Sequence, residues 1–252
     1  MENLKVSTAR RVCEVEISRP KTKNSFSTAM YADFSEVLRT ADADDEVRVL
    51  LVHGAEGNFS SGNDLKDFAE NPPTGSDNGP FDFIKALTEF SKPMIAAVDG
   101  FAVGIGATML LHCELVYATE RAKFVLPFVN LALVPEAGST LLLPQRAGHR
   151  LASELLLFGE PFDTATAIQA GLVNRLVPAD ELLPFARKRA SQLAAKPPAA
   201  VRETKALLKA QQAESLERCV HTEAEIFLRL LAEPHAQEAI HAFLEKRKPD
   251  FE

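Results

Sequence analysis

Two short, glycine-bearing stretches of this chain contain residue types that could hold negative charge. One is Ser-Ser-Gly-Asn-Asp-Leu at residues 60–65, and the other runs from Gly100 to Gly106. Each is predicted to join a strand to a helix, where the first backbone N–H groups of the helix lack partners and carry partial positive charge. Glycine lets a ligand approach such a backbone closely. Both stretches could therefore stabilise an anion or a developing oxyanion.

A third stretch contains a candidate base. Glu136 follows Pro135, with apolar residues at 131–134 before it and leucines at 141–143 after it. A carboxylate held among apolar groups has a raised proton affinity, which suits a general base. Glu136 is therefore the predicted proton-transfer residue.

An ordinary structural role is the alternative for each stretch. Residues 100–106 could be a packing turn, and they do not complete a GxGxxG nucleotide fingerprint because Met109 stands where the third glycine belongs. Asp64 could simply cap a helix, and Pro135-Glu136 is a common helix start. The functional interpretation depends on all three stretches together, because each alone has a plain structural explanation.

Composition and charge argue against several classes of protein. The net charge of −7 disfavours nucleic acid as the main partner. No apolar run approaches the ~20 residues of a membrane span, so we expect no membrane segment. The three cysteines are isolated, which indicates a reducing compartment, and we expect a cytoplasmic protein. The six histidines show no HExxH spacing, and we expect no metal site.

The elements that must position these residues change in character along the chain. Strands are expected at 4–8, 11–17, 47–53, 94–98, 115–118, 123–125 and 172–176. Helices are expected at 81–90, 107–112, 137–147, 149–158, 163–169, 180–194, 199–212, 214–231 and 234–247, with a further helix starting after Ser27. A tight turn is predicted at 100–106, and a mobile surface loop at 71–79. Sheets covered by helices thus precede a helical tail, which should dock on the core or on another subunit.

Taken in order, the motifs resemble the crotonase superfamily, also called the enoyl-CoA hydratase/isomerase family. The resemblance extends over nearly the whole chain. It rests on Arg19-Pro20 with Asn24, on the order and spacing of residues 95–178, and on Ala-Gly-Leu-Val-Asn-Arg-Leu-Val at 170–177. Several separated motifs that agree in order make the resemblance specific.

The resemblance implies a fold and an assembly. The fold is of the α/β class, with a spiral of ββα turns at 1–195 that contains an acyl-CoA site, followed by a helical trimerisation region at 196–252. The implied assembly is a homotrimer or a hexamer. The implied ligand is an acyl-CoA thioester, and no separate cofactor is expected because coenzyme A is part of the substrate.

The resemblance also implies roles for individual residues. The backbone N–H groups of Asn63 and Ile105 would form the oxyanion hole, and Glu136 matches the single base of the peroxisomal-type isomerases. Thr108 and Phe128 stand where hydratases of the family have two glutamates that handle water, so both carboxylates are missing here. The remaining substrate-binding candidates are Ser61, Gly62, Asp64, Leu65, Gly104, Phe128 and Leu133, and the CoA phosphate candidates are Lys23 and Lys246.

The reaction implied by this branch of the family is a double-bond shift from 3-enoyl-CoA to trans-2-enoyl-CoA in fatty-acid metabolism. Glu136 would remove a proton from C2 and return it at C4, while the oxyanion hole stabilises the dienolate. One alternative is a 2-enoyl-CoA hydratase or another crotonase reaction, such as acyl-CoA hydrolysis. A further alternative, from a different class, is a non-catalytic CoA-binding subunit.

Overall fold

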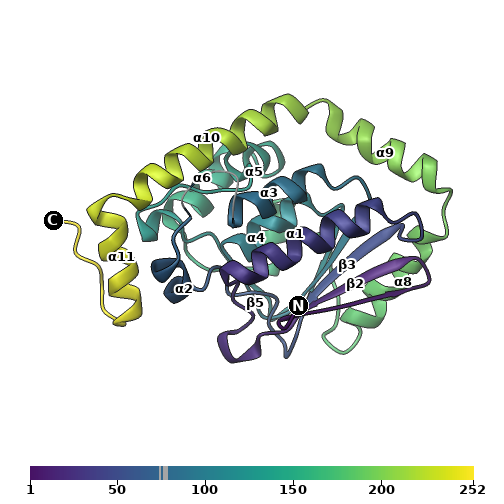
Figure 1. The fold of residues 1–252 in the computed structure, drawn as a ribbon, viewed down its shortest axis with the longest axis horizontal. Coiled ribbons are helices and arrows are strands. Elements are labelled where there is room, and N and C mark those ends of the chain that lie inside the picture. Colours follow the sequence, from purple (N-terminus) through teal and green to yellow (C-terminus); the bar gives the residue numbers. More distant parts are fainter. Residues whose placement is uncertain (74, 76–78) are drawn as a thin grey trace.

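The computed structural model describes residues 1–73, 75 and 79–252, which fold around two β-sheets (Figure 1). The larger sheet has the strand order β1 (Leu4–Ala9), β2 (Val12–Ile17), β3 (Val49–Gly54), β4 (Met94–Val98), β6 (Leu115–Ala118) and β9 (Arg175–Leu176). β1 and β2 are antiparallel, and the later neighbours are parallel. The smaller sheet joins β5 (Phe101–Val103), β7 (Lys123–Val125) and β8 (Phe162–Asp163).

Helices connect the strands and form the C-terminal part of the chain. Those before β9 are α1 (Thr28–Ala43), α2 (Leu65–Glu70), α3 (Pro80–Glu89), α4 (Ile105–Thr108), α5 (Ser139–Ala147), α6 (His149–Phe158) and α7 (Thr164–Gln169). After β9 come α8 (Leu182–Ala194), α9 (Pro198–Ala210), α10 (Ala213–Leu231) and α11 (Pro234–Leu244). Turns of 3-10 helix occur at η1 (Pro20–Thr22), η2 (Met109–His112) and η3 (Val129–Leu131).

Alternate residues of the larger sheet pack against helices on its two faces, as the pleat of a β-strand requires. On one face, Val49 and Leu51 belong to a cluster completed by α8. On the other face, Leu50 and Val52 belong to the main core, together with buried residues of α1 and α3. Figure 1 shows α8 and α1 on opposite sides of β2 and β3. Both faces of the parallel strands are therefore covered, and the strands can be apolar throughout.

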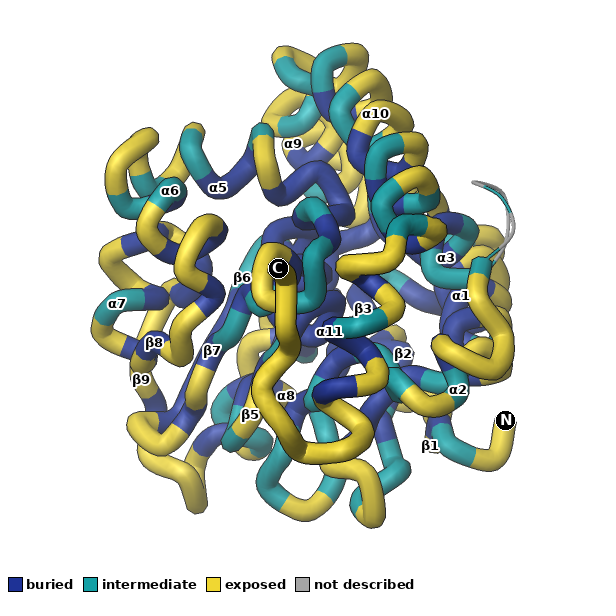
Figure 2. The backbone as a smooth tube through the Cα atoms, turned by 90° about the vertical axis from the view of Figure 1, so that its left-hand side faces the viewer, coloured by how far each residue is buried: buried dark blue, intermediate teal, exposed yellow. Residues whose placement is uncertain are grey.

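The C-terminal helices form an arc along the outside of the molecule (Figure 1). α10 packs on α5, and α11 packs on α2 and η3. Figure 2 shows that the segment after α11 is exposed, whereas the strands beneath are buried. Among the described residues, none of the helices combines the length and the apolar character needed to cross a membrane.

The α/β class and the helical C-terminal part are confirmed, but two expectations near the candidate site are wrong. Residues 100–106 are not one tight turn, because Phe101–Val103 forms β5 and pairs in register with β7. Three residues are too few for alternation to show in the sequence. The helix expected at 137–147 begins only at Ser139, because Ala137 (φ 61°) and Gly138 (φ 70°) adopt the left-handed conformation.

Smaller differences concern element boundaries. The strand expected at 172–176 is reduced to Arg175–Leu176, because Asn174 pairs with Val116 partly through its side-chain oxygen, which accepts from the Val116 N–H at 2.6 Å. The helix expected at 107–112 starts at Ile105 and continues as the 3-10 turn η2. The mobile loop predicted at 71–79 includes residues 74 and 76–78, which lie outside the described residues.

Candidate active site

Backbone pairing holds the first glycine-bearing stretch on both sides. Ser60 pairs with β5, and Asn63 pairs with Phe26, whose N–H donates to Gly62 O at 2.8 Å. Gly62 has φ +83°, and a Cβ there would lie 2.6 Å from Val103 O, so the position requires glycine. Within the described part of the chain, the N–H of Asn63 has no acceptor. It is therefore free to donate to a ligand.

The second stretch runs through β5 into α4. Gly104 (φ +53°) precedes the helix, so the N–H of Ile105 is one of the unpartnered donors of the first turn. Gly106 packs directly on Ser60, because a Cβ there would lie 2.9 Å from the Ser60 carbonyl oxygen. The two stretches are therefore in contact, and Asn63 and Ile105 line the same cavity.

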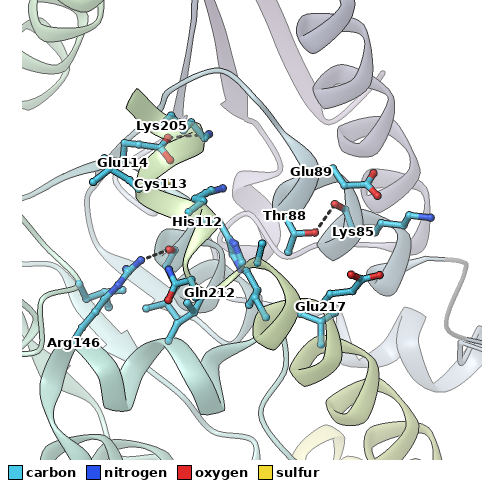
Figure 3. Close-up of a pocket in the computed structure, with 18 of the residues that line it drawn as sticks. Lys85, Thr88, Glu89, His112, Cys113, Glu114, Arg146, Lys205, Gln212 and Glu217 are labelled. Carbon is cyan, nitrogen blue, oxygen red and sulfur yellow. Dashed lines mark hydrogen bonds and ion pairs between the residues drawn. The ribbon is translucent and has the colours of Figure 1, made fainter. Parts of the chain in front are cut away.

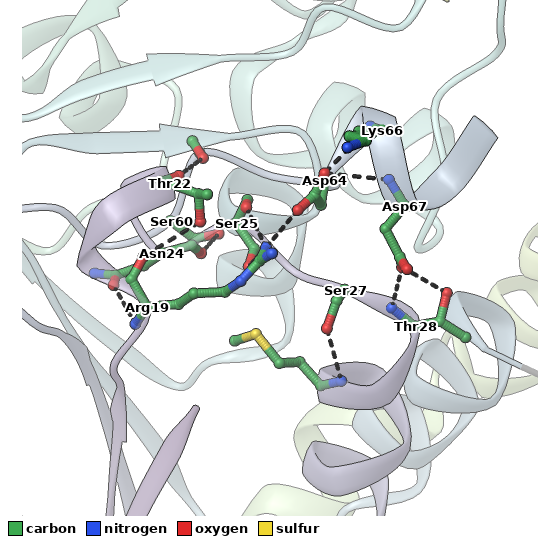
Figure 4. Close-up of polar contacts among 12 residues, drawn as sticks. Arg19, Thr22, Asn24, Ser25, Ser27, Thr28, Ser60, Asp64, Lys66 and Asp67 are labelled. Atoms are coloured by element: carbon green, nitrogen blue, oxygen red, sulfur yellow. Dashed lines mark hydrogen bonds and ion pairs between the residues drawn. The ribbon is translucent and has the colours of Figure 1, made fainter. Parts of the chain in front are cut away.

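A polar network fixes the helix that follows the first stretch (Figure 4). The Asp64 carboxylate caps α2 by accepting from the N–H groups of Lys66 and Asp67, and it pairs with Arg19 at 2.5 Å. Arg19 also donates to Ser25 Oγ at 2.8 Å. Burial alone would raise the pKa of Asp64, but the Arg19 and backbone hydrogen bonds hold it below its ordinary value. Asp64 thus lines the cavity as a charged residue that caps α2, and both of its carboxylate oxygens already accept hydrogen bonds from the protein.

Glu136 lies at the start of a turn with left-handed backbone at Ala137 and Gly138. The residue is 6% exposed, and Oε1 accepts a hydrogen bond from the Thr108 hydroxyl of α4. Burial raises the pKa of Glu136 to about 8, with the Thr108 hydrogen bond lowering it and the charge of Glu223 raising it further. A carboxyl group with this pKa can accept and return a proton near neutral pH.

Side chains from distant segments hold the Glu136 turn. Glu223 of α10 accepts from the N–H of Gly138 at 2.6 Å and from the N–H of Thr140 at 2.9 Å, and so replaces the missing N-cap side chain of α5. The His112 Nε2–H donates to Ala137 O at 2.7 Å. Burial lowers the pKa of His112 to about 3, so the ring is neutral. His112 is thus a hydrogen-bonded structural residue of the buried core.

A cavity of about 470 Å³ contains these groups. Its lining includes the following predicted site residues: Ser61, Gly62, Asn63, Asp64, Leu65, Gly104, Ile105, Phe128, Leu133 and Glu136. The two phosphate candidates are not among the lining residues; Lys23 instead lies 4.5 Å from the Phe101 ring centroid. Two cationic side chains, Lys66 and Arg247, line the cavity. Two aromatic rings from the C-terminal helices, Phe227 and Phe243, line it as well. The predicted spiral core (1–195) and the predicted helical region (196–252) therefore both contribute residues to the wall of the cavity.

Sequence reasoning missed two residues that support the site. Tyr31 of α1 donates its hydroxyl hydrogen to Asn63 Oδ1, and Glu223 caps the Glu136 turn. Tyr31 occurs among apolar residues at helical spacing and is therefore indistinguishable from a core residue in the sequence. Glu223 is 5% exposed, yet it lies beside Thr222 and two residues before Glu225, which are both polar, so no local pattern marks its burial.

A larger cavity of about 760 Å³ lies between the α9–α10 arm and the core, and it contains none of the predicted site residues (Figure 3). Its polar lining includes Arg146, which donates to Leu111 O at 2.6 Å, and Lys205, whose Nζ lies 3.1 Å from Glu114. Among the residues that the structure describes, no cluster of three or more His, Cys, Asp or Glu side chains could hold a metal ion. We therefore assign the candidate active site to the smaller cavity, whose lining contains the predicted site residues.

Comparisons with known proteins identify the family of the chain. A family model described as Enoyl-CoA hydratase/isomerase matches residues 7–252. The 2,3-dehydroadipyl-CoA hydratase of Escherichia coli (strain K12) is 36% identical over 253 residues, which cover 100% of this chain and 99% of that protein. Enoyl-CoA delta isomerase 2 of Homo sapiens is 33% identical over 222 residues, covering 85% of this chain and 56% of that protein. The crystal structure of an enoyl-CoA hydratase/isomerase from Pseudoalteromonas atlantica T6c has a TM-score of 0.93 at 38% identity, covering 99% of this chain and 100% of that one.

The chain belongs to the enoyl-CoA hydratase/isomerase family and has the crotonase-like α/β fold. The resemblance of the sequence motifs to the crotonase superfamily is confirmed. The protein is accordingly a crotonase-family acyl-CoA enzyme.

Proposed function

We propose that the protein shifts the double bond of 3-enoyl-CoA thioesters to give trans-2-enoyl-CoA. The observation that carries this proposal is the single buried carboxylate, Glu136, in a cavity whose wall also contains Asn63 and Ile105. The two positions that the family resemblance assigns to hydratase glutamates hold Thr108 and Phe128. One carboxylate and two N–H donors suffice for a proton shuttle.

The proposed reaction consists of two proton transfers. The ionised Glu136 takes a proton from C2, and the C2–H electron pair moves toward the thioester carbonyl, leaving negative charge on its oxygen. The N–H groups of Asn63 and Ile105 would stabilise that charge, each donor being worth about 3 kcal/mol in the transition state. Glu136 then returns the proton to C4 as the double bond forms between C2 and C3. No water, metal or second carboxylate takes part in this sequence.

Three features of the site support the return of the proton. The Thr108 hydroxyl donates a hydrogen bond to Oε1 of Glu136, so Oε2 is the oxygen that would exchange the proton with the substrate. Phe128 and Leu133 are buried in the cavity wall and would help to exclude water, which competes for the dienolate and for the carboxyl proton. A pKa of about 8 lets the Glu136 carboxyl hold the proton between the two steps.

Hydration of 2-enoyl-CoA is the second candidate. It is favoured by the similarity over full length to a protein named 2,3-dehydroadipyl-CoA hydratase. In this case Glu136 alone would have to orient the attacking water and supply the C2 proton. A CoA-binding subunit without catalysis is the third candidate, in which the same cavity would only hold the thioester.

One set of assays separates the three candidates. Purified protein and the Glu136→Gln variant are each given 3-hexenoyl-CoA and, separately, crotonyl-CoA. We expect isomerisation of 3-hexenoyl-CoA that the variant loses, and slow or absent hydration of crotonyl-CoA. Fast hydration without isomerisation would overturn the proposal, and undiminished turnover in the variant would remove Glu136 from the mechanism. CoA binding without turnover of either thioester would establish the non-catalytic role.

We also propose that the chain assembles as a homotrimer or a hexamer. Lys205 is the one buried residue of α9, whereas Leu207 and Leu208 are 72% and 71% exposed. Since helices gain most of their stability from packing, α9 needs a further partner, and a second copy of the chain would supply it. Light scattering should give a mass of three or six chains, and the Leu207→Glu, Leu208→Glu double variant should lower it. A monomeric wild-type protein would contradict the proposal.

A further inference from the structure

The Tyr31 hydroxyl makes a hydrogen bond to the first glycine-bearing stretch, residues 60–65. Tyr31 lies on α1, is 2% exposed, and donates to Asn63 Oδ1. Asn63 is the residue whose backbone N–H belongs to the proposed oxyanion hole. The family resemblance gives no role to the Asn63 side chain, because only its N–H group is used there. The structure nevertheless engages that side chain with a buried donor.

Aromatic packing fixes the position of the Tyr31 ring. Its centroid lies 5.1 Å from the Phe26 ring and 5.6 Å from the Phe83 ring, both in tilted geometry. Phe26 also pairs with Asn63 through the backbone. Asn63 is therefore held from two sides, by backbone pairing with Phe26 and by a side-chain hydrogen bond from Tyr31.

The Tyr31 hydroxyl keeps its proton at neutral pH and is therefore a donor there. Burial raises its pKa well above the ordinary value, and the negative charge of Glu136 raises the pKa further. A donor that keeps its proton fixes which end of the Asn63 amide faces it, because only Oδ1 can accept.

We propose that Tyr31 is a positioning residue of the oxyanion hole: its hydroxyl fixes the Asn63 side chain and thereby the direction of the Asn63 N–H. This inference rests on the proposed function only in taking the thioester oxygen as the group that the N–H contacts. Small errors in the direction of an oxyanion donor reduce the stabilisation of the transition state more than the binding of the ground state. Loss of the hydroxyl should therefore reduce kcat and leave KM nearly unchanged.

The chain has two tyrosines, and the second provides a matched control. Tyr117 is also buried, its hydroxyl accepts one hydrogen bond from Arg189 Nε at 3.3 Å, and it belongs to the core cluster on the α8 side of the sheet. Tyr31→Phe and Tyr117→Phe thus delete the same group from two buried sites. We expect Tyr31→Phe to lower kcat about tenfold with KM changed less than twofold, and Tyr117→Phe to leave both within twofold.

A spectroscopic measurement tests the inference without turnover. The absorption of 4-(dimethylamino)cinnamoyl-CoA moves to the red when its thioester oxygen accepts hydrogen bonds, because the excited state carries more charge there. We expect a red shift on the wild type and on Tyr117→Phe, and a smaller shift on Tyr31→Phe. A Tyr31→Phe variant with the wild-type shift would overturn the inference. A wild type that shows the shift, dependent on Tyr31, but isomerises no enoyl-CoA would overturn the proposed function alone.

A second comparison distinguishes positioning from general loss of stability. In an Asn63→Ala background the Tyr31 hydroxyl has no side chain to hold. We expect Tyr31→Phe to cause no further fall in kcat there, so that the double variant equals Asn63→Ala. Independent, multiplicative losses would show that Tyr31 acts through packing and would overturn its role at Asn63.

Discussion

The two glycine-bearing stretches and the Glu136 turn line one cavity but are held in different ways. Gly62 and Gly106 bring two backbone segments into direct contact, and strand pairing at Ser60 fixes their register. The Glu136 turn is held instead by side chains of distant segments, Glu223 and His112. The proposed donors thus depend on backbone conformation and on pairing between backbone segments, whereas the proposed base depends on side chains from distant segments.

This difference has a chemical reason. A backbone N–H is a good donor in any environment, so it needs only the right direction and the absence of a competing acceptor. A glutamate becomes a base with a pKa near neutrality only when it is removed from water. We therefore expect the two regions to respond differently to substitution.

Replacing Glu136 with Gln should lower kcat about 10³-fold, because the variant cannot accept a proton. The folded carboxyl has a pKa of about 8, above the ordinary value of 4.5, so its contribution to stability is complete below the unfolded pKa and is lost as the pH rises through 8. The free energy of unfolding of the variant should therefore fall less steeply between pH 5 and pH 8, as measured with urea. Equal slopes in both proteins would show that the buried carboxyl is not protonated.

Replacing Gly62 with Ala should lower kcat/KM about 10²-fold, as expected for the loss of one oxyanion donor. The added Cβ would lie 2.6 Å from Val103 O and push the two stretches apart. Gly148→Ala is the control, because Gly148 has a similar φ of +76° but open space around the Cβ position. Steady-state kinetics should show a loss only for Gly62→Ala. Equal losses would attribute the effect to backbone strain rather than to the contact.

Replacing Glu223 with Gln should lower kcat about tenfold and the free energy of unfolding by about 1–2 kcal/mol. The neutral amide keeps one acceptor for the N–H groups of Gly138 and Thr140 but loses the stronger charge-assisted bonds. Glu225→Gln on the same helix should be silent, because Glu225 is exposed and its ion pair is with His221, which is exposed as well. An unchanged kcat in Glu223→Gln would show that the turn does not need support from α10.

Replacing Thr108 with Val should have the smallest effect, about threefold at pH 7. The Thr108 hydrogen bond lowers the pKa of Glu136, so its loss should raise that pKa. Since the base must be ionised, kcat/KM should rise with pH, and the midpoint of this rise should move to higher pH in the variant. A midpoint that moves to lower pH would contradict the role of Thr108 as donor to Glu136.

Much of this site was predictable because its signals are local. The glycines at 62, 104 and 106 mark the places where backbone segments must adopt positive φ or approach closely, and each lies in or beside a predicted strand-to-helix junction. Glu136 stands out because its neighbours are apolar. The short strand β5 was missed because three residues contain too little pattern, and Ala137 gave no sign of its left-handed conformation.

The amino-acid sequence was enough to identify the family and to mark the two glycine-bearing stretches and the candidate base, because residue type and short-range order specify turns and caps. Only the tertiary structure decided that Tyr31 holds the Asn63 side chain, that Glu223 caps the turn after Glu136, and that C-terminal residues complete the cavity. The physical reason is that a raised pKa and a fixed side chain both require burial by segments far apart along the chain, which no local pattern encodes.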